Sequence, residues 1–407
     1  MAAPPMAASR SRIPAQLDWL NFFLADVRDG LGPYLAIYLL AVQKWDEASI
    51  GVVMSIAGIA AILTQTPAGA FIDQTKAKRG LIVTAAIATT ACCALLPLFP
   101  DFWPVALTQA LSGAAGSVFQ PAVAAITLGT MGPKVFTQRN GRNEAFNHAG
   151  NAFAAIAAGG LAYFFGPVVV FYLLAAMAVA SCVVTLTISP DAIDADMARG
   201  LHENGDGADK PSGFRMLLTN RPLLIFAICM VFFHFANAAM LPLVGQKLTK
   251  VNKELGTTLM SACIVAAQLV MIPVALIVGA KADAWGRKPI FIGGFVVLVL
   301  RGALYTVSDN PFWLVAVQAL DGVGAGIFGA CFPVVVNDVT KGSGHFNVSQ
   351  SAIVTATGIG GALSTSVAGA IVVSAGYSAA FLVLAGIAAV GLVLFLLMMP
   401  ETKSGTR

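Results

Sequence analysis

Twelve long apolar runs constrain the fold of this chain more than any other feature. A helix needs roughly 20 apolar residues to cross a bilayer. Only 11% of the 407 residues are charged, against about 25% in a soluble domain, so the chain cannot cover a water-facing surface. The sequence therefore predicts an all-α membrane protein with twelve transmembrane helices, at residues 17–42, 49–72, 80–99, 103–129, 143–166, 168–189, 222–247, 257–280, 288–307, 312–338, 348–374 and 377–399.

The lysines and arginines predict how these helices are oriented. Cytoplasmic loops of membrane proteins carry an excess of basic residues. If both termini are cytoplasmic, eighteen basic residues fall in inner segments and four in outer segments, with Arg28 and Arg301 inside the membrane. We therefore expect both termini to be cytoplasmic. The basic residues form no cluster of the kind that binds phosphate backbones, so no nucleic-acid partner is expected.

The longest polar segment divides the chain into two halves. Residues 190–221 are polar, acidic and glycine-rich, which predicts a flexible cytoplasmic linker. The linker separates an N-terminal six-helix bundle, residues 1–189, from a C-terminal six-helix bundle, residues 222–407. Because each half begins and ends on the cytoplasmic side, the two bundles are expected to be related by a pseudo-symmetry axis along the membrane normal.

Short motifs recur between the two halves. The loop GAFIDQTKAKR at 69–79 matches the loop GAKADAWGRKP at 279–289, since each has an Asp four residues after its first Gly and then a basic pair. The sequence QALSG at 109–113 likewise matches QALDG at 318–322. A charged, sharply turning loop that recurs at half the chain length indicates a duplicated membrane protein.

These features resemble the major facilitator superfamily of secondary transporters, and the resemblance covers essentially the whole chain. The second loop is the closer match, because Lys76 stands in the first loop where the family has a second glycine. The resemblance implies a multi-pass protein of a plasma membrane, the bacterial inner membrane. It also implies that the loops form a cytoplasmic latch that stabilises the outward-open state, made of Asp73, Lys78, Arg79, Asp283, Arg287 and Lys288.

The sequence departs from the proton-driven drug exporters of this superfamily at two places. Those exporters carry an Arg in the fourth helix where this chain has Gln109. They also carry a Gly-Pro motif in the fifth helix, where this chain has Ala155 and Ile156. The direction of transport and the class of substrate therefore stay open.

The first apolar run contains three ionisable residues, Asp26, Arg28 and Asp29. Ionisable side chains inside a membrane are costly and usually functional. Asp26 and Asp29 are three residues apart and share a helix face, next to a helix break expected at Pro33. We expect both acids to be proton-coupling groups and Arg28 to face the substrate cavity. The alternative is a structural pair with Arg28 or with a polar residue of another helix.

A polar stripe opens the fifth run. Asn143, Asn147 and Asn151 repeat every four residues, as do Glu144 and His148. Lipid does not tolerate such a stripe, so it must face the cavity or another helix. Glu144 and His148 are proton-coupling candidates, and Asn147 and Asn151 are candidates for lining the substrate cavity. The alternative is that these amides hold neighbouring helices together.

Other polar residues inside the runs are candidates for binding substrate or for stabilising the fold. Four could line the cavity or instead bridge helices: Gln109, His234, Asn237 and Gln318. Arg301 and Asp321 lie at similar depths in neighbouring runs. We expect these two to form a structural ion pair.

The sequence predicts transport rather than catalysis. It contains no nucleotide-binding loop, no enzyme motif and no metal-ligand cluster, so we expect no catalytic residue, cofactor or bound metal. We expect a secondary active transporter, acting as a monomer, that moves a small-molecule substrate with protons by rocking of its two halves. An uncoupled facilitator is the alternative within transport. A receptor or a membrane-embedded enzyme is disfavoured, because the longest loop is too short and too polar for a soluble module.

Overall fold

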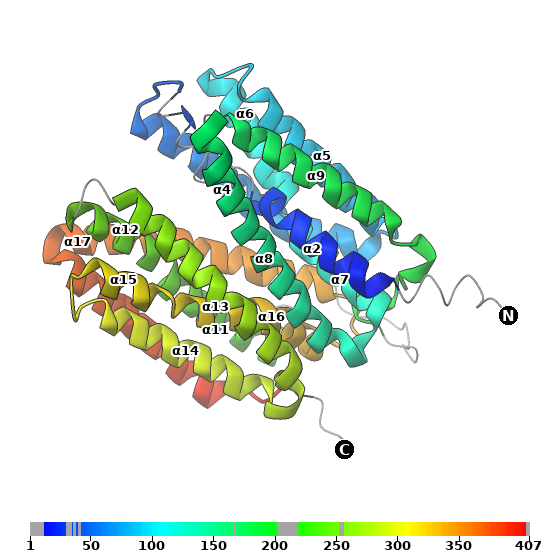
Figure 1. Ribbon diagram of the computed structural model, residues 1–407. Coiled ribbons are helices and arrows are strands. Elements are labelled where there is room, and N and C mark those ends of the chain that lie inside the picture. Colours follow the sequence, from blue (N-terminus) through cyan, green and yellow to red (C-terminus); the bar gives the residue numbers. More distant parts are fainter. Residues whose placement is uncertain are drawn as a thin grey trace. The chain divides into compact units, whose positions relative to one another are not determined.

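The computed structural model describes residues 12–29, 35, 38–39, 42–165, 168–201, 219–251 and 256–403. In these ranges every regular element is a helix (Figure 1). The first half contains α2 (Ile13–Asp29), α4 (Glu47–Gln74), α5 (Lys78–Leu95), α6 (Phe102–Gly116), α7 (Phe119–Met131), α8 (Pro133–Phe165) and α9 (Val169–Thr187). Two short 3₁₀ helices follow, η1 (Pro190–Ala192) and η2 (Met197–Arg199).

The second half repeats this helical organisation. It contains α11 (Arg221–Ala238), α12 (Met240–Val251), α13 (Gly256–Trp285), α14 (Arg287–Leu304), α15 (Pro311–Gln318), α16 (Asp321–Thr340) and α17 (Phe346–Met398). The last of these is two helices joined at Gly376, whose φ of 84° is not helical. This kink lies between the last two expected runs.

The helices of the described chain overlap the apolar runs, although α8 begins at Pro133, ahead of the run expected at 143–166. Within those residues, eight segments are long and apolar enough to cross a membrane, which agrees with a multi-pass membrane protein. The number of twelve spans and the cytoplasmic position of the termini stay predictions, and residues 1–11 and 404–407 lie outside the described ranges.

Several helices begin at residues that cap them. Asp46 precedes α4 and its Oδ1 accepts a hydrogen bond from the backbone N–H of Ser49 at 2.8 Å. Asn220 precedes α11 and accepts from the backbone N–H of Leu223 at 3.1 Å. Such caps satisfy backbone donors that the first turn of a helix leaves unpaired. They explain why helices start just before the apolar runs begin.

Three runs expected to be continuous helices are instead pairs of helices, α6–α7, α11–α12 and α15–α16. At the first break the backbone N–H of Val118 donates to Ala115 O, three residues back, at 3.1 Å. At the third break the N–H of Leu320 donates in the same way to Val317 O at 3.1 Å. A local tightening from four-residue to three-residue bonds often marks a hinge. Apolar residues continue through each break, so hydropathy could not reveal it.

Contacts between residues group the chain into two compact units, which are described separately. The first unit draws its described residues from Met1–Phe136, Phe146–Asp206 and Gly342–Ser351. The second draws them from Thr137–Ala145, Gly207–Lys341 and Ala352–Arg407. The helices α8 and α17 therefore each contribute residues to both units.

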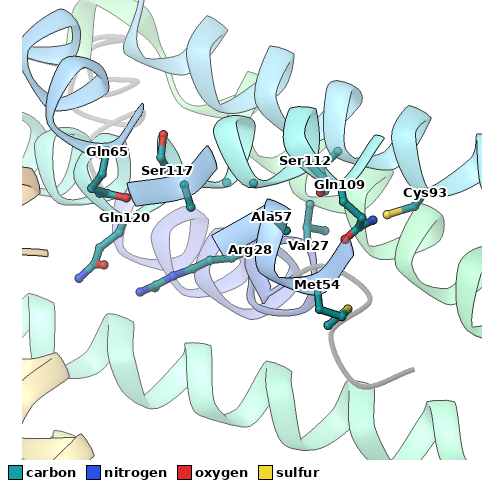
Figure 2. Close-up of a pocket in the computed structure, with 14 residues that line it drawn as sticks. Val27, Arg28, Met54, Ala57, Gln65, Cys93, Gln109, Ser112, Ser117 and Gln120 are labelled. Atoms are coloured by element: carbon teal, nitrogen blue, oxygen red, sulfur yellow. The ribbon is translucent and has the colours of Figure 1, made fainter. Parts of the chain in front are cut away.

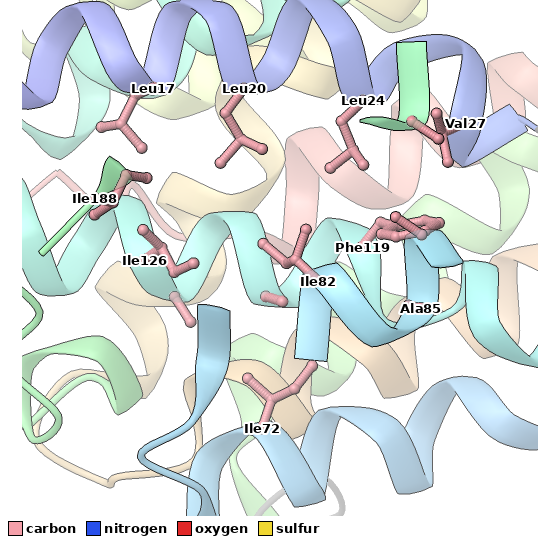
Figure 3. Close-up of a cluster of buried hydrophobic side chains, with 14 of the residues drawn as sticks. Leu17, Leu20, Leu24, Val27, Ile72, Ile82, Ala85, Phe119, Ile126 and Ile188 are labelled. Carbon is pink, nitrogen blue, oxygen red and sulfur yellow. The ribbon is translucent and has the colours of Figure 1, made fainter. Parts of the chain in front are cut away.

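One face of α2 supplies much of the core of the first unit. Leu17, Leu20, Leu24 and Val27 recur at spacings of three and four residues, so their side chains lie along one helical stripe. Figure 3 shows this stripe facing side chains from other helices, including Phe119 at the start of α7. The stripe is almost completely buried, with at most 3% of any of these four residues exposed.

Each unit contains a very close helix approach at the glycine that ends the repeated QAL-x-G motif. A Cβ added to Gly113 would lie 2.2 Å from the carbonyl oxygen of Ala57 on α4. A Cβ added to Gly322 would lie 2.4 Å from the carbonyl oxygen of Ala267 on α13. No larger residue fits at either position, and small residues are what allow helix backbones to approach in membranes. The two halves thus use the same glycine in the same way.

An ion-pair network fills the interior of the second unit. Arg301 of α14 is 2% exposed, and its Nη1 pairs with Asp321 Oδ1 at the start of α16. Its Nη2 donates to Asn237 Oδ1 of α11 at 2.6 Å. Gln318 Nε2 donates to the second oxygen of Asp321 at 3.1 Å, and the Tyr305 hydroxyl donates to Gln318 Oε1. The network therefore joins the ends of α11 and α15, where two of the three helix breaks lie.

Neutralising one partner of this pair should destabilise the second unit. Arg301→Met or Asp321→Leu alone leaves an uncompensated buried charge, at a cost of about 3–5 kcal/mol. The double variant removes both charges and should recover much of the folding yield. Thermal melting of the wild type and the three variants in detergent measures this. A double variant as unstable as the sum of the two single variants would show that the two charges do not depend on each other.

Candidate functional site

The first unit contains a partly open pocket of about 300 Å³ among α2, α4, α5, α6 and α7 (Figure 2). Apolar residues form part of its wall, and the rest is polar. The polar side chains of this wall include Arg28, Gln65, Thr89, Gln109, Ser112 and Gln120. Within the described lining, Arg28 is the charged residue, and no aspartate or glutamate contributes to the wall.

The long polar side chains of the pocket have no partner among the described residues. Gln65 and Gln109 are each only 8% exposed. Neither they nor Arg28 and Gln120 form a hydrogen bond or ion pair with another described residue. Figure 2 shows Arg28, Gln65 and Gln120 toward one end of the pocket and Gln109 toward the other. Their polar groups are thus available to a bound molecule.

The first of the two repeated loops places Asp73 against the start of α17. Asp73 lies at the end of α4 and is 8% exposed. Its Oδ1 accepts from the backbone N–H of Asn347 at 3.2 Å and from Asn347 Nδ2 at 2.7 Å. Its Oδ2 accepts from the backbone N–H of Val348 at 2.9 Å. A carboxylate is favoured there because the first N–H groups of a helix are unpaired and carry partial positive charge.

The basic residues of the first loop bind backbone carbonyls rather than Asp73 in the described structure. Lys78 is 1% exposed and its Nζ donates to Thr75 O at 2.8 Å. Arg79 donates to Thr185 O at 3.2 Å and to Leu186 O at 2.8 Å, at the end of α9. A cation at a helix C-terminus interacts favourably with the helix dipole. These residues therefore anchor the loop within its own unit.

The segment from Pro190 to residue 201 packs against the same site. Its Asp194 N–H donates to Gly129 O of α7 at 3.0 Å, and its Gly200 O accepts from the Gly342 N–H at 2.8 Å. Ala198 is fully buried, and its carbonyl accepts from Asn347 Nδ2 at 3.0 Å. The side-chain amide of Asn347, which donates to Asp73, thus also donates to the first part of the expected linker. Residues 202–218 of that linker lie outside the described ranges.

The second repeated loop is organised around Arg287. Arg287 Nη1 pairs with Asp283 Oδ1 at 2.7 Å, and its Nε pairs with Asp338 Oδ2 of α16 at 2.9 Å. The side chain of Asp283 is 54% exposed, whereas that of Asp338 is 12% exposed. Lys288 Nζ donates to Leu396 O at 2.8 Å. Asp338 is therefore the more buried partner of Arg287.

Glu401 caps the start of α14 in this second loop. Its two carboxylate oxygens accept from the backbone N–H groups of Arg287 at 2.9 Å and Lys288 at 3.0 Å. Partial burial raises the pKa of Glu401, but backbone donors including those of Lys403, Arg287 and Lys288 outweigh it and leave the pKa below its ordinary value. The cap therefore stays ionised at neutral pH.

The polar stripe of α8 divides between the two units. In the second unit, Asn140 Nδ2 donates to Gly329 O at 3.0 Å, and a Cβ added to Gly329 would lie 2.9 Å from Glu144 Oε2. The Glu144 carboxylate thus lies against the backbone of α16. In the first unit, Asn147 and His148 are each 8% exposed. Both are buried within protein.

The remaining candidates of the first unit lie on α2 and α6. Asp26 is partly buried on α2, and the side chain of Asp29 lies outside the described residues. Arg28 and Gln109 line the same pocket. The structure therefore brings together two of the expected cavity residues, one from the first apolar run and one from the fourth.

The remaining candidates of the second unit are engaged with other protein groups. His234 Nδ1 lies 3.2 Å from Met230 O, and its ring centroid lies 4.5 Å from that of Phe328. Asn237 and Gln318 belong to the Arg301 network. Among the described residues, no group of three His, Cys, Asp or Glu side chains could hold a metal ion.

Several partners of the repeated loops had no signal in the sequence. Asn347 precedes a run of apolar and hydroxyl side chains, Asp338 lies at the end of an apolar run, and Glu401 follows the last run. Each is more than 50 residues away in the chain from the loop residue that it contacts. The one local hint is that Asn347 precedes the eleventh run, where a helix N-terminus is expected.

Comparisons with known proteins agree with this helical fold. The family model described as Major Facilitator Superfamily matches residues 18–300 and 251–407. The chain is 60% identical over 403 residues to an uncharacterized MFS-type transporter of Mycobacterium tuberculosis, covering 99% of this chain and 95% of that protein. Its structure is similar to that of the E. coli fucose:proton symporter FucP, with a TM-score of 0.75, 14% identity and coverage of 98% and 100%.

A second solved structure, the nucleoside transporter NupG, is similar over 95% of this chain and 100% of its own, with a TM-score of 0.65 and 18% identity. These two likenesses concern the fold. The family match extends over nearly all the chain and agrees with the closely similar mycobacterial protein. The chain therefore belongs to the Major Facilitator Superfamily of transporters.

Proposed function

We propose that this protein is a secondary active transporter of the plasma membrane that moves a small solute by alternating access, coupled to protons. The proposal rests first on the contacts of Asp73 with the start of α17. Three hydrogen bonds hold the two together, with no covalent link. Such charge-assisted contacts can break and reform as a protein changes conformation.

The place of α17 supports this role for Asp73. Residues Gly342–Ser351 belong to the first unit, whereas the rest of α17 belongs to the second. Loss of the Asp73 contacts would release the first turns of α17 from the first unit. Asp73, with Lys78 and Arg79 anchoring its loop, is therefore our proposed latch of the first half, and Asp283, Arg287 and Lys288 form that of the second.

Proton coupling is proposed for four titratable groups, Asp26, Asp29, Glu144 and His148. Carboxylates and imidazoles within membrane helices commonly carry protons in pumps and transporters. FucP, whose fold this chain shares, is described as a proton symporter, and this supports coupling without identifying the solute. An uncoupled facilitator is the alternative. The solute and the direction of transport are open in both.

Removing the charge of Asp73 should loosen the start of α17. In Asp73→Asn, one oxygen of the carboxylate becomes a donor that faces the N–H groups of Asn347 and Val348. A hydrogen bond to a charged group contributes about 1.5–3 kcal/mol, so hydrogen exchange in residues 346–351 should become at least about tenfold faster. Hydrogen-exchange mass spectrometry of the purified full chain measures this directly.

Asp283→Asn is the matched control for this variant. Asp283 is half-exposed, and Arg287 keeps its ion pair with Asp338 when the charge of Asp283 is lost. The exchange of residues 346–351 should therefore stay at the wild-type rate. Equal exchange rates at the start of α17 in Asp73→Asn and in wild type would remove the basis of the proposed latch.

The coupling groups can be tested once uptake and efflux profiling of a deletion strain has identified a transported solute. In proteoliposomes, wild type should accumulate that solute under an imposed pH gradient. Asp29→Asn should retain exchange of solute but lose accumulation, because a carboxamide cannot carry a proton. Glu144→Gln is the parallel variant for the α8 stripe. Wild-type flux that ignores the pH gradient would favour the facilitator.

A further inference from the structure

We propose that the pocket of the first unit binds the carboxylate of a small, hydroxylated organic anion, with Arg28 as its counter-charge. The inference rests on the proposed transport function and names the substrate class of that transporter. It is carried by the chemistry of the pocket wall, which lies entirely within the first unit.

The charge of Arg28 is the first argument. Arg28 is partly buried on α2, and a guanidinium in a membrane-spanning helix is costly unless water, an anion or hydrogen-bond acceptors match it. Arg301 in the second unit has Asp321 and Asn237 as partners. Arg28 has no such partner among the described residues, and the described wall of its pocket contains no carboxylate. An anion supplied from outside the protein would provide the missing charge.

The shape of the guanidinium narrows the type of anion. Its planar fork of N–H donors matches the two oxygens of a carboxylate and can bind them in a bidentate manner. A lysine ammonium is a point charge and has no such preference. The pocket therefore favours a carboxylate over a single-atom anion such as chloride.

The neutral polar groups of the pocket indicate hydroxyl groups on the same molecule. Gln65, Gln109 and Gln120 each offer a carbonyl acceptor and an amide donor. A hydroxyl group can pair with either, because it both donates and accepts hydrogen bonds. Thr89 is 1% exposed, and its Oγ1 has no hydrogen-bond partner. A buried hydroxyl without a partner is unfavourable. Thr89 therefore adds a hydroxyl without a protein partner to this wall.

The volume of the pocket suits a small solute. Pockets for small molecules measure about 300–1,000 Å³, and this one, at about 300 Å³, lies at the lower end of that range. A hydroxy acid of a few carbons up to a sugar acid is of a suitable size. Bulky, apolar compounds match neither the volume nor the amide-rich wall.

Binding to the purified full-length protein in chloride-free detergent solution tests the proposal. Gluconate and sorbitol form a matched pair, because they differ in having a carboxylate or a hydroxymethyl group at one end. Lactate and lactamide repeat the comparison with a smaller molecule. At least one of the two acids should bind with a Kd at least tenfold lower than that of its neutral partner, measured by calorimetry and by thermal stabilisation.

Variants assign this preference to the pocket. Arg28→Gln keeps a polar side chain but removes the charge, and it should lower affinity for the acid at least tenfold, to that of the neutral partner. Arg28→Lys keeps the charge without the fork and should lose only part of the affinity. Thr89→Val should weaken the hydroxylated acid about threefold or more. Arg221→Gln, which removes an exposed charge at the start of α11, is the control and should bind as wild type does.

Three outcomes would overturn the proposal. The proposal is wrong if neither acid binds better than its neutral partner, if chloride alone stabilises the protein as strongly as the acids do, or if Arg28→Gln retains the wild-type preference. Flux measurements separate this inference from the proposed function. Proton-driven transport of a neutral solute would support the proposed transport function and contradict the proposal that the substrate is an anion. If an acid binds in a way that depends on Arg28 but is never transported, the anion site is supported and the proposed transport function is not.

Discussion

Every charge inside these apolar units requires an opposite charge or a set of hydrogen-bond partners, because neither lipid nor aliphatic side chains replace its hydration. The protein meets this requirement in three ways. Arg301 is matched by a carboxylate, Asp73 by the backbone N–H groups at the start of a helix, and Lys78 by a carbonyl at the end of another. Arg28 lacks all three among the described residues, which is what distinguishes its pocket.

The two repeated loops show how duplicated sequences reach different local solutions. The first loop has one residue more between its Asp and its basic pair than the second. In the second loop Gly286 adopts a φ of 90°, a conformation that favours glycine, and a Cβ there would also lie 2.5 Å from Glu401 Oε2. In the first loop the helix begins after Ala77, with a φ of −87°. The extra residue removes the need for glycine, so Lys76 can stand in its place.

The fold was largely predictable from the sequence, whereas the contacts of the site were only partly so. Apolar runs and capping residues such as Asp46 locate the helices, because both signals are local. Hydropathy did not predict the breaks inside three runs, since apolar residues continue through them, although Pro242, which predicts a kink in the seventh run, lies three residues after the break at Ala239. The partner of Asp73 could not be found either, because the match depends on which helix end the tertiary fold brings to the loop. Arg28 and Gln109 were expected to line a cavity, but the intervening Gln65 and Thr89 read as ordinary membrane residues.

The cap of the second loop also sets an order of assembly. Glu401 is 114 residues after Arg287 in the chain, which at a synthesis rate of 5–20 residues per second corresponds to roughly 6–23 seconds. During that interval the loop exists without its carboxylate, and water has to satisfy the N–H groups of Arg287 and Lys288. The interval between synthesis of Asp73 and of its partner Asn347 is longer, because the two are 274 residues apart. Both loops are therefore completed late in biosynthesis, well after the helices that flank them have been made.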